Sequence, residues 1–424
     1  MLVRQARLGS IVISFAIGCG GGGNGNGADA HHNVDAVGTH PDASNPSGLV
    51  AVPLTTPGEL VFTAPMKFGT QSFNMLVDTG SSSTGVAATS CTNCGVSPAY
   101  TPGGGATDQH ATASSTFGDG TGWSGEVYAD TAAIGTGFAV KLDFAAITSN
   151  NGFFRGGFDG IVGLGPDDLL LPHTTSYVDA AVTAGMLPQF AFEECVNDGT
   201  MWLGGYDNAA VAQPVVFTPM TGAGYYTVGI AGMAIGATDL GLSSASFGDT
   251  IVDTGTSISF IPSAAQNAIL SKVNASAGFK AVFGSQSLTA GGCVSSSLSA
   301  AQIDAMLPTL GLTFPDAGGG ATTAVPVAAT RSYLVDEGGG NYCLAFEDAG
   351  QLGMSLIGGT LLSGLVTVFD VGNNQVGFAP EAGCPANDIG PKPAHVTHGS
   401  PEHPWWLDDP RVRVPAAARA KYAR

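Results

Sequence analysis

One short phrase occurs twice in this chain, and it constrains the fold more than any other feature. The first copy, LVDTGSSSTGV, covers residues 76–86, and the second, IVDTGTSISFI, covers residues 251–261. Each copy has two aliphatic residues, then Asp-Thr-Gly, then a hydroxyl residue. An apolar-apolar-Gly element follows each copy, as GIVGLG at 160–165 and as SLIGGT at 355–360. This repeat of long period predicts one duplicated β lobe, in which each copy contributes one Asp.

The rest of the chain also favours strands over helices. The sequence has 63 Gly and only 11% charged residues, which argues against long amphipathic surface helices. Short β-rich runs such as VTVFDV and QVGFAP are separated by Gly, Pro, Asn and Ser. The best helix candidates are SYVDAAVTAGM at 176–186 and SAAQNAILSKV, which follows Pro262. We therefore expect an all-β protein with few helices.

The two Asp residues of the repeated phrase, Asp78 and Asp253, permit a specific kind of chemistry. A buried carboxylate is costly unless it is hydrogen-bonded or paired. Two carboxyl groups held side by side cannot both ionise cheaply, so they share one proton over a wide pH range. One member can then accept a proton from water while the other donates a proton to a carbonyl oxygen. The pair titrates as a unit, so the acid and the base are not assigned separately.

The residues after each Asp fit the same chemistry. The glycines allow a close backbone approach beside each carboxylate. The threonines can hydrogen-bond to the opposite loop, and the next hydroxyl residue can hydrogen-bond to the outer oxygen of its own Asp. One Asp-Thr-Gly is ordinary turn chemistry, but two copies in matching contexts argue against turns alone. The supporting residues expected here are Thr79, Gly80, Ser81, Thr254, Gly255 and Thr256.

At this point the chain resembles the pepsin-like (family A1) aspartic proteases. The likeness covers about residues 49–384 and includes FDGIVGLG at 158–165 and YYTVGIAGMAIG at 225–236. The run SLIGGTLLSGLVTVFDVGNNQVGFAP at 355–380 resembles the last strands of that family almost phrase for phrase.

The resemblance implies an all-β, bilobal, pepsin-like double-ψ β-barrel fold. A sheet shared between the lobes would join residues 49–205 to residues 206–384, with a substrate cleft between the lobes. It also implies that Asp78 and Asp253 form the catalytic pair, which activates one water to attack a peptide carbonyl. Phe153, Phe154 and Phe158 are then expected near the binding pockets, although aromatic residues at these positions can equally be core.

The chain departs from the family at the flap, a β-hairpin that covers the cleft. The corresponding stretch is SSTFGDGTGWSGEVYAD at 114–130, in which Phe117 stands where the family has Tyr. The Trp that usually bonds this Tyr is replaced by Gly85, so both partners are absent together. We expect the hairpin to form, with Phe117 covering the cleft; the alternative is that Trp123 or another aromatic residue substitutes locally. The expected flap tip comprises Phe117, Gly118, Asp119 and Gly120.

Six cysteines remain when Cys19 is set aside. An even number in an exported chain indicates disulfides. The Cys91–Cys94 spacing could also belong to a zinc or redox site, but no second CxxC, no nearby His and no βαβ pattern completes one. The resemblance implies three bridges, namely Cys91–Cys94, Cys293–Cys343 and Cys195–Cys384.

Both ends of the chain differ in composition from the body. Arg4 and Arg7 precede a short apolar run that ends in AIGC, which resembles a lipoprotein signal over residues 1–19 with Cys19 as the lipidated residue. Ordinary secretion is the alternative. Residues 20–48 are expected to form a disordered tether rich in Gly, Asn and His. Residues 385–424 form a Pro-rich tail with a basic end, for which a disordered extension is the default expectation and docking of Trp405 and Trp406 is the alternative.

Charge narrows the range of partners. Between Leu49 and Cys384 the chain has 6 Lys or Arg against 26 Asp or Glu, so this surface repels nucleic acid. Residues 20–60 contain no Lys or Arg, which rules out a basic N-terminal segment as an electrostatic lock on the cleft. We expect no cofactor and no metal, a monomer, polypeptide substrates, and membrane contact only through an N-terminal lipid. The expected location is outside the cytoplasm: periplasmic, on the cell surface, or secreted.

Two functions of different classes remain open. The first is an aspartic endopeptidase that cuts extended polypeptides. The second is a non-catalytic protein on the pepsin scaffold that binds peptides or other proteins, because a fold alone does not guarantee activity. Both Asp loops are intact, and this favours the enzyme. A glycosidase with paired carboxylates is remote, since it predicts acidic residues on unrelated loops.

Overall fold

The computed structural model describes residues 48–58, 60–195, 198–222, 224–319, 322–383, 400, 403–407 and 412–422. The expected signal segment with Cys19, nearly all of the expected tether, and Cys384 lie outside the described residues. Within the described part of the chain, no helix has the length and apolar character needed to span a bilayer.

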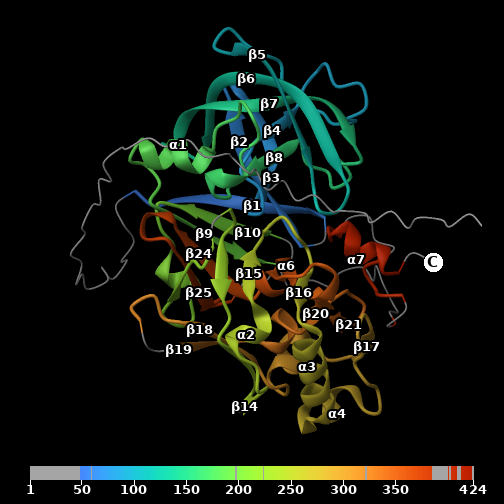
Figure 1. The fold of residues 1–424 in the computed structure, drawn as a ribbon. Coiled ribbons are helices and arrows are strands. Elements are labelled where there is room, and N and C mark those ends of the chain that lie inside the picture. Colours follow the sequence, from blue (N-terminus) through green and yellow to red (C-terminus); the bar gives the residue numbers. More distant parts are fainter. Residues whose placement is uncertain are drawn as a thin grey trace, which may run out of the picture. The chain divides into compact units, whose positions relative to one another are not determined.

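The largest sheet has 13 strands and contains segments from both halves of the chain (Figure 1). In sheet order its strands are β11 (Val216–Pro219), β25 (Gln375–Pro380), β24 (Leu365–Asp370), β9 (Gln189–Glu194), β10 (Asp198–Leu203), β1 (Val50–Gly58), β2 (Val61–Phe68), β3 (Gln71–Asp78), β8 (Gly160–Gly163), β4 (Gly85–Ala87), β7 (Ala139–Asn151), β6 (Gly122–Ile134) and β5 (Thr107–Thr116).

The middle of this sheet joins the two lobes. Strand β1 pairs with β10, β10 pairs with β9, and β9 pairs with β24, which comes from the end of the second lobe. All these pairings are antiparallel. The shared sheet expected from the resemblance is therefore present, and the all-β, bilobal expectation is confirmed.

Three smaller sheets belong to the second lobe. The first has the order β12 (Thr227–Gly229), β15 (Asp249–Val252), β23 (Ser355–Ile357), β16 (Ser259–Ile261) and β22 (Phe346–Asp348). The second has the order β14 (Thr238–Asp239), β13 (Gly232–Ile235), β18 (Leu310–Pro315) and β19 (Thr322–Val327). The third has the order β17 (Cys293–Ser295), β21 (Asn341–Leu344) and β20 (Leu334–Asp336).

The duplication seen in the sequence is visible in the strand pairing. In the first lobe, β3 runs parallel to β8, and β8 pairs antiparallel with β4. In the second lobe, β15 runs parallel to β23, and β23 pairs antiparallel with β16. Each lobe thus places the strand that leads into its Asp beside the apolar-apolar-Gly element of its own half. This is the physical meaning of the long-period repeat.

The helices are few and short, as expected. Both candidates form: α1 spans Tyr177–Thr183, where the Ser176 side chain caps the amide of Asp179, and α3 spans Ser263–Ala275. The remaining helices are α2 (Ser244–Phe247), α4 (Ala277–Phe283), α5 (Ala300–Asp304), α6 (Gly359–Leu362) and α7 (Ala416–Ala420), with 3₁₀ turns at η1 (Asp167–Leu169), η2 (Asn208–Ala210), η3 (Ala329–Arg331), η4 (Ala349–Gln351) and η5 (Val371–Asn373).

The expectation of a disordered tail is wrong for residues 403–407 and 412–422. Trp405 and Trp406 are only 3% and 0% exposed. Each indole nitrogen has an acceptor, because Nε1 of Trp405 donates to the Leu344 carbonyl at 3.1 Å and Nε1 of Trp406 donates to Glu347 at 3.0 Å. Two large aromatic side chains that are buried with satisfied N–H groups provide enough contact to hold a Pro-rich segment against the body.

Candidate active site

Equivalent backbone positions hold Asp78 and Asp253. Asp78 ends β3, and its carbonyl oxygen accepts a hydrogen bond from the amide of Leu164 at 2.8 Å. Asp253 directly follows β15, and its amide donates to the carbonyl oxygen of Ile357 at 2.9 Å. Both residues are buried, at 5% and 9% exposure. Each Asp is therefore fixed by the apolar-apolar-Gly element of its own lobe.

Two threonines connect the two Asp loops through reciprocal hydrogen bonds. The amide of Thr79 donates to Oγ1 of Thr254, and the amide of Thr254 donates to Oγ1 of Thr79, both at 3.1 Å. The hydroxyl of Thr79 also donates to the carbonyl of Val252 at 2.8 Å, and that of Thr254 donates to the carbonyl of Val77 at 3.0 Å. The cross-loop bonds expected from the sequence are present and tie the lobes together beneath the carboxylates.

The two carboxylates accept matching sets of hydrogen bonds. Asp78 accepts from the amide of Gly80 at 2.8 Å and from the hydroxyl of Ser81 at 2.6 Å. Asp253 accepts from the amide of Gly255 and the hydroxyl of Thr256 at the same two distances. These bonds fix the orientation of both carboxyl groups, because each group is held at both of its oxygens.

The glycines of the repeated phrase are required by close contact. A Cβ atom at Gly80 would lie 2.7 Å from the carboxyl carbon of Asp253. A Cβ atom at Gly255 would lie 2.4 Å from an oxygen of Asp78. Each glycine therefore packs directly against the carboxyl group of the opposite lobe, and any side chain at either position would separate the pair.

The buried position of the two carboxyl groups favours a proton on Asp78. Burial raises the pKa of Asp78 from 3.8 to about 7, and the charge of Asp253 adds to this increase. The Ser81 hydroxyl, the positive charge of Arg413 and the Gly80 amide act in the opposite direction and lower the pKa. At acidic pH the site therefore holds a proton that it can donate, together with acceptor oxygens that can take one from water.

The flap hairpin forms between β5 and β6. Strand pairing ends at Thr116 and Gly122, and the amide of Phe117 donates to the carbonyl of Thr121 at 2.9 Å to close the turn. Gly120 has φ +80°, which favours glycine. The Asp119 carboxylate accepts from both the amide and the hydroxyl of Thr121, at 2.9 and 2.6 Å. The Gly-Asp-Gly sequence thus makes the tip, as expected.

The Phe117 ring packs against an apolar cluster of the first lobe. Its ring stacks on Phe153 at 5.2 Å between centroids and 20° between planes. Phe153 and Phe158 are each 1% exposed and belong to one apolar cluster of the first lobe. They are therefore core residues, as the alternative held, although both also border a pocket that includes Asp119 and Arg155.

Trp123 fills the space left by the small residue after the first Asp loop. A Cβ atom at Gly85 would lie 3.2 Å from Cζ2 of Trp123 and 3.1 Å from Cδ1 of Ile147. Trp123 is 3% exposed, and its ring nitrogen has no hydrogen-bond partner among the described residues. Trp123 is therefore a buried residue that packs beside Gly85.

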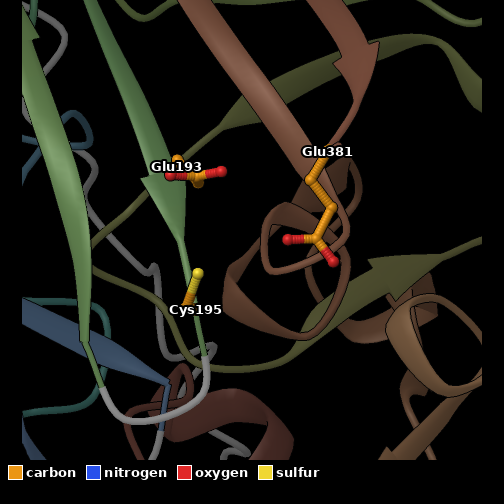
Figure 2. A group of neighbouring side chains, drawn as sticks. All are labelled: Glu193, Cys195 and Glu381. Carbon is orange, nitrogen blue, oxygen red and sulfur yellow. The ribbon is translucent and has the colours of Figure 1, made fainter. Parts of the chain in front are cut away.

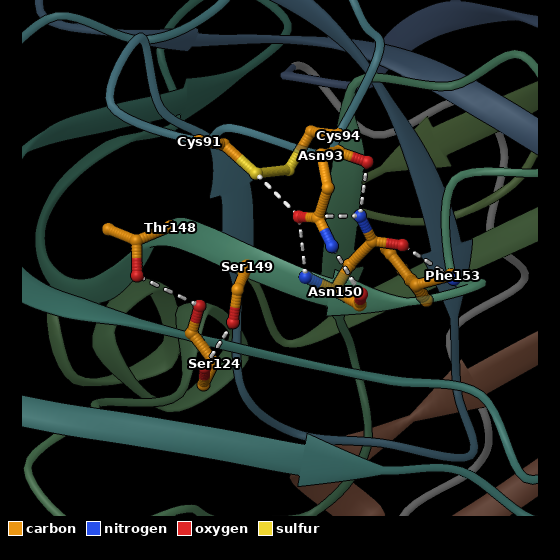
Figure 3. Close-up of a disulfide and its surroundings, with 8 residues drawn as sticks. All are labelled: Cys91, Asn93, Cys94, Ser124, Thr148, Ser149, Asn150 and Phe153. Carbon is orange, nitrogen blue, oxygen red and sulfur yellow. Dashed lines mark hydrogen bonds between the residues drawn. A yellow bond between two sulfur atoms is a disulfide. The ribbon is translucent and has the colours of Figure 1, made fainter.

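The Cys91–Cys94 disulfide closes a loop beside Phe153, the residue on which Phe117 stacks (Figure 3). Within this loop, the Asn93 side chain donates to the carbonyl of Asn150 at 2.9 Å. The Asn150 side chain donates to the carbonyl of Asn93 at 2.9 Å and accepts from the amide of Phe153 at 3.0 Å. The loop therefore positions Phe153, which in turn supports Phe117.

The other cysteines are also engaged. Cys293 and Cys343 are bonded and face each other across β17 and β21. Cys195 is disulfide-bonded as well, while Cys384, its expected partner, lies outside the described residues.

Figure 2 shows Cys195 close to Glu193 and Glu381. Among the described residues these three form the group of potential metal ligands, with their ligand atoms all within 4.8 Å of one another. The bonded sulfur of Cys195 cannot act as a thiolate ligand, and Glu381 forms an ion pair with Arg331 at 3.4 Å.

Sequence reasoning missed two residues near the pair. Tyr225 is partly buried, and burial together with the charges of Asp253 and Asp78 raises the pKa of its phenol. Its hydroxyl therefore stays protonated. Arg413, from the tail, acts on Asp78 from the other end of the chain. Tyr225 lies in the YYTVG run that opens the second lobe, but no sequence signal placed Arg413 at the site.

Comparison with known proteins agrees with this geometry. The family model "eukaryotic aspartyl protease" matches residues 62–381. An "aspartic protease" of Phaffia rhodozyma is 32% identical over 326 residues, which is 76% of each chain. A "vacuolar aspartic protease" of Candida albicans is 27% identical over 78% of each chain. An "embryonic pepsinogen" of Gallus gallus is 26% identical over 82% of this chain and 88% of its own. The chain belongs to the eukaryotic aspartyl protease family, and it is an aspartic endopeptidase.

Proposed function

We propose that Asp78 and Asp253 hydrolyse peptide bonds by activating one water molecule between them. The observation that carries this proposal is the matched pair of hydrogen-bond sets on the two carboxylates. One carboxylate accepts a proton from the water as its oxygen attacks the peptide carbonyl carbon. The protonated partner donates to the carbonyl oxygen, and a proton then passes to the leaving nitrogen as the C–N bond breaks.

The supporting residues have distinct roles in this proposal. Ser81 and Thr256 orient the outer oxygens, while Gly80 and Gly255 let the carboxyl groups approach each other. Thr79 and Thr254 hold the two loops in register. Phe117 covers the cleft from the flap, and Tyr225 supplies a protonated hydroxyl at its edge. None of these steps needs a metal or a cofactor.

The test is cleavage of a denatured protein substrate between pH 3 and pH 7, with and without pepstatin. Asp78→Asn and Asp253→Asn should each abolish cleavage, because the shared proton and the acceptor oxygens are both required. Asp239→Asn is the matched control, since Asp239 is exposed at the end of β14, where it accepts from the amide of Gly241, and Asn can keep that bond. Full activity in either catalytic variant would refute the assignment. Absence of cleavage by well-folded wild type would favour the peptide-binding alternative.

We also propose that the protein is exported and anchored through a lipid on Cys19, with residues 20–48 as the tether and the folded body outside the cytoplasm. The disulfides support an oxidising compartment, and the AIGC run supports lipidation. Wild type should incorporate labelled palmitate and partition with membranes, whereas Cys19→Ala should do neither. Membrane partitioning of the Cys19→Ala variant would rule out the anchor.

A further inference from the structure

The tail returns to the active site. Residues 412–422, here called the tail segment, meet the second Asp loop through Arg413. The amide of Ser257 donates to the carbonyl oxygen of Arg413, and the amide of Arg413 donates to the hydroxyl of Ser257, both at 2.9 Å. Ser257 directly follows Thr256, which holds Asp253. Arg413 is thus held by both its N–H and its C=O to one residue of the second Asp loop, once through the Ser257 hydroxyl and once through the Ser257 amide.

The tail segment also contacts the flap tip. The amide of Ala416 donates to the carbonyl oxygen of Gly118, and α7 begins at this point (Figure 1). Pro415 lies against Gly118, so that a Cβ atom at Gly118 would be 3.8 Å from Cβ of Pro415. The few residues from Arg413 to Ala416 therefore bridge the flap and the Asp253 loop.

The Arg413 side chain fills the space between these two anchors. Its guanidinium lies 5.6 Å from the ring centre of Phe117 and 5.5 Å from that of Phe153. Its Nη2 pairs with Asp119 at 3.7 Å, and both side chains are largely buried, at 13% and 15% exposure. The acidic body and the basic tail segment, which carries Arg413, Arg419 and Lys421, are thus complementary in charge.

Other residues anchor the tail segment to the second lobe. Val412 and Val414 are 2% and 1% exposed and share an apolar cluster with Trp405 and Trp406. Within the tail segment itself, Nη2 of Arg419 donates to the carbonyl of Val412 at 2.8 Å. Arg413 is bound less completely than Val412 and Val414. Nε of Arg413 is buried without a hydrogen-bond partner among the described residues. An unsatisfied donor lowers the cost of displacing this part of the tail segment.

We propose that the tail segment is a built-in inhibitor that occupies the substrate cleft of its own chain. A peptide must lie between the flap tip and the Asp loops to reach the carboxyl pair, and Arg413–Ala416 lie there. The full-length enzyme therefore rests in a blocked state, and substrate competes with the tail segment for Ser257 and the flap. This inference rests on the catalytic role proposed for Asp78 and Asp253.

The test compares full-length Arg413→Glu with Lys141→Glu, which makes the same charge change on an exposed side chain of β7. Arg413→Glu should repel Asp119 and release the segment. We expect kcat/KM on a fluorogenic peptide to rise about 10-fold, because the unblocked fraction of the enzyme rises by that factor. Lys141→Glu should match wild type. A synthetic peptide with the sequence of residues 410–424 should inhibit Arg413→Glu competitively with substrate, and a scrambled peptide should not.

Hydrogen exchange separates failure of this inference from failure of the proposed catalysis. The amide of Ser257 and the flap-tip amides should exchange faster in Arg413→Glu than in wild type and Lys141→Glu, whether or not any form cleaves peptide. Unchanged exchange would overturn the docking. Faster exchange with unchanged kcat/KM, in a wild type that cleaves peptide, would overturn the inhibition. Should Arg413→Glu fold poorly, Arg413→Ala gives the same readouts.

Discussion

Thr79 and Thr254 exchange hydrogen bonds across the lobes, with each amide donating to the other's hydroxyl at 3.1 Å. Each hydroxyl then donates to a carbonyl on the strand that leads into the opposite Asp. The amides and hydroxyls of both threonines thus all have partners, although both residues are buried. Because of these bonds, the position of each carboxylate depends on the backbone of the other lobe.

Breaking this junction should cost both stability and activity. Thr79→Val keeps the shape but leaves the amide of Thr254 and the carbonyl of Val252 without partners. We expect the free energy of unfolding to fall by about 2–6 kcal/mol, since each of these two buried unsatisfied groups costs about 1–3 kcal/mol. Denaturant unfolding measures this loss. Thr107→Val, on the exposed face of β5, is the control and should change little. A stability equal to wild type in Thr79→Val would show that the junction is not a unit.

Stability should depend on pH through Asp78. In the unfolded chain this carboxyl titrates near its ordinary value of 3.8, whereas in the folded chain burial raises the pKa to about 7. The folded state binds the proton more tightly, so this contribution to stability is fully present below about pH 4 and is lost as the pH rises to about 7. Burial raises the pKa of Glu194 as well, which acts in the same direction.

Thermal unfolding of wild type and Asp78→Asn between pH 4 and pH 8 tests this dependence. The neutral Asn cannot titrate, so the variant should lose less stability than wild type as the pH rises. Parallel decline in the two proteins would show that Asp78 does not hold the proton in the folded state.

The packing of Trp123 against Gly85 predicts a specific clash. Gly85→Ala would bring a methyl group to 3.1 Å from Cδ1 of Ile147 and 3.2 Å from the Trp123 ring. We expect a destabilisation of about 1–3 kcal/mol, as is usual when a methyl group is added to a packed core. Ile147→Val removes Cδ1, so it should partly rescue Gly85→Ala in the double variant although it is destabilising alone. Additive losses in the double variant would exclude this contact as the cause.

The Asn93–Asn150 bonds should control the flap through Phe153. Asn150→Ala removes the side-chain contacts to Asn93 and to the Phe153 amide. The stack of Phe153 on Phe117 should loosen, and KM should rise about 5-fold, equivalent to about 1 kcal/mol of binding, with kcat nearly unchanged. Ser149→Ala on the same strand loses only its bond to Ser124 and is the matched control. A fall in kcat without a change in KM in Asn150→Ala would contradict a positioning role.

Substitutions of Trp406 should lower stability and raise activity. Trp406→Ala removes a fully buried ring and the bond to Glu347, and we expect a loss of about 3–5 kcal/mol in unfolding free energy. Activity should rise, because the anchor of the tail segment is lost. Trp406→Phe removes only the bond and should give smaller changes of the same sign. Reduced activity in both variants, measured well below their unfolding temperatures, would count against inhibition by the tail segment.

The two Asp loops, the duplicated strand pattern around them and the flap tip could all be predicted from the amino-acid sequence. These features depend on short-range rules: Gly where backbone and carboxylate touch, hydroxyl residues within a few positions of the Asp, and Gly-Asp-Gly at a hairpin turn. The cross-loop hydrogen bonds of Thr79 and Thr254 could be predicted because the same Asp-Thr-Gly motif occurs twice. A repeated local motif predicts its own hydrogen bonds even when the positions of distant segments are unknown.

Three features could not be predicted from the sequence and became visible only in the folded chain. They are the stack of Phe117 on Phe153, the position of Trp123 beside Gly85, and the docking of the tail segment. Each depends on contacts between residues far apart in the chain, and no local pattern encodes such pairs. The tail shows this most clearly, because its Pro-rich and basic composition favours disorder, and the Trp405–Trp406 pair indicates only that it could dock, not where. Its order comes from Trp405 and Trp406 burying against the second lobe and from Arg413 meeting an acidic, aromatic surface. The free energy that orders such a segment lies in the surface that it covers, and that surface exists only after the two lobes have folded.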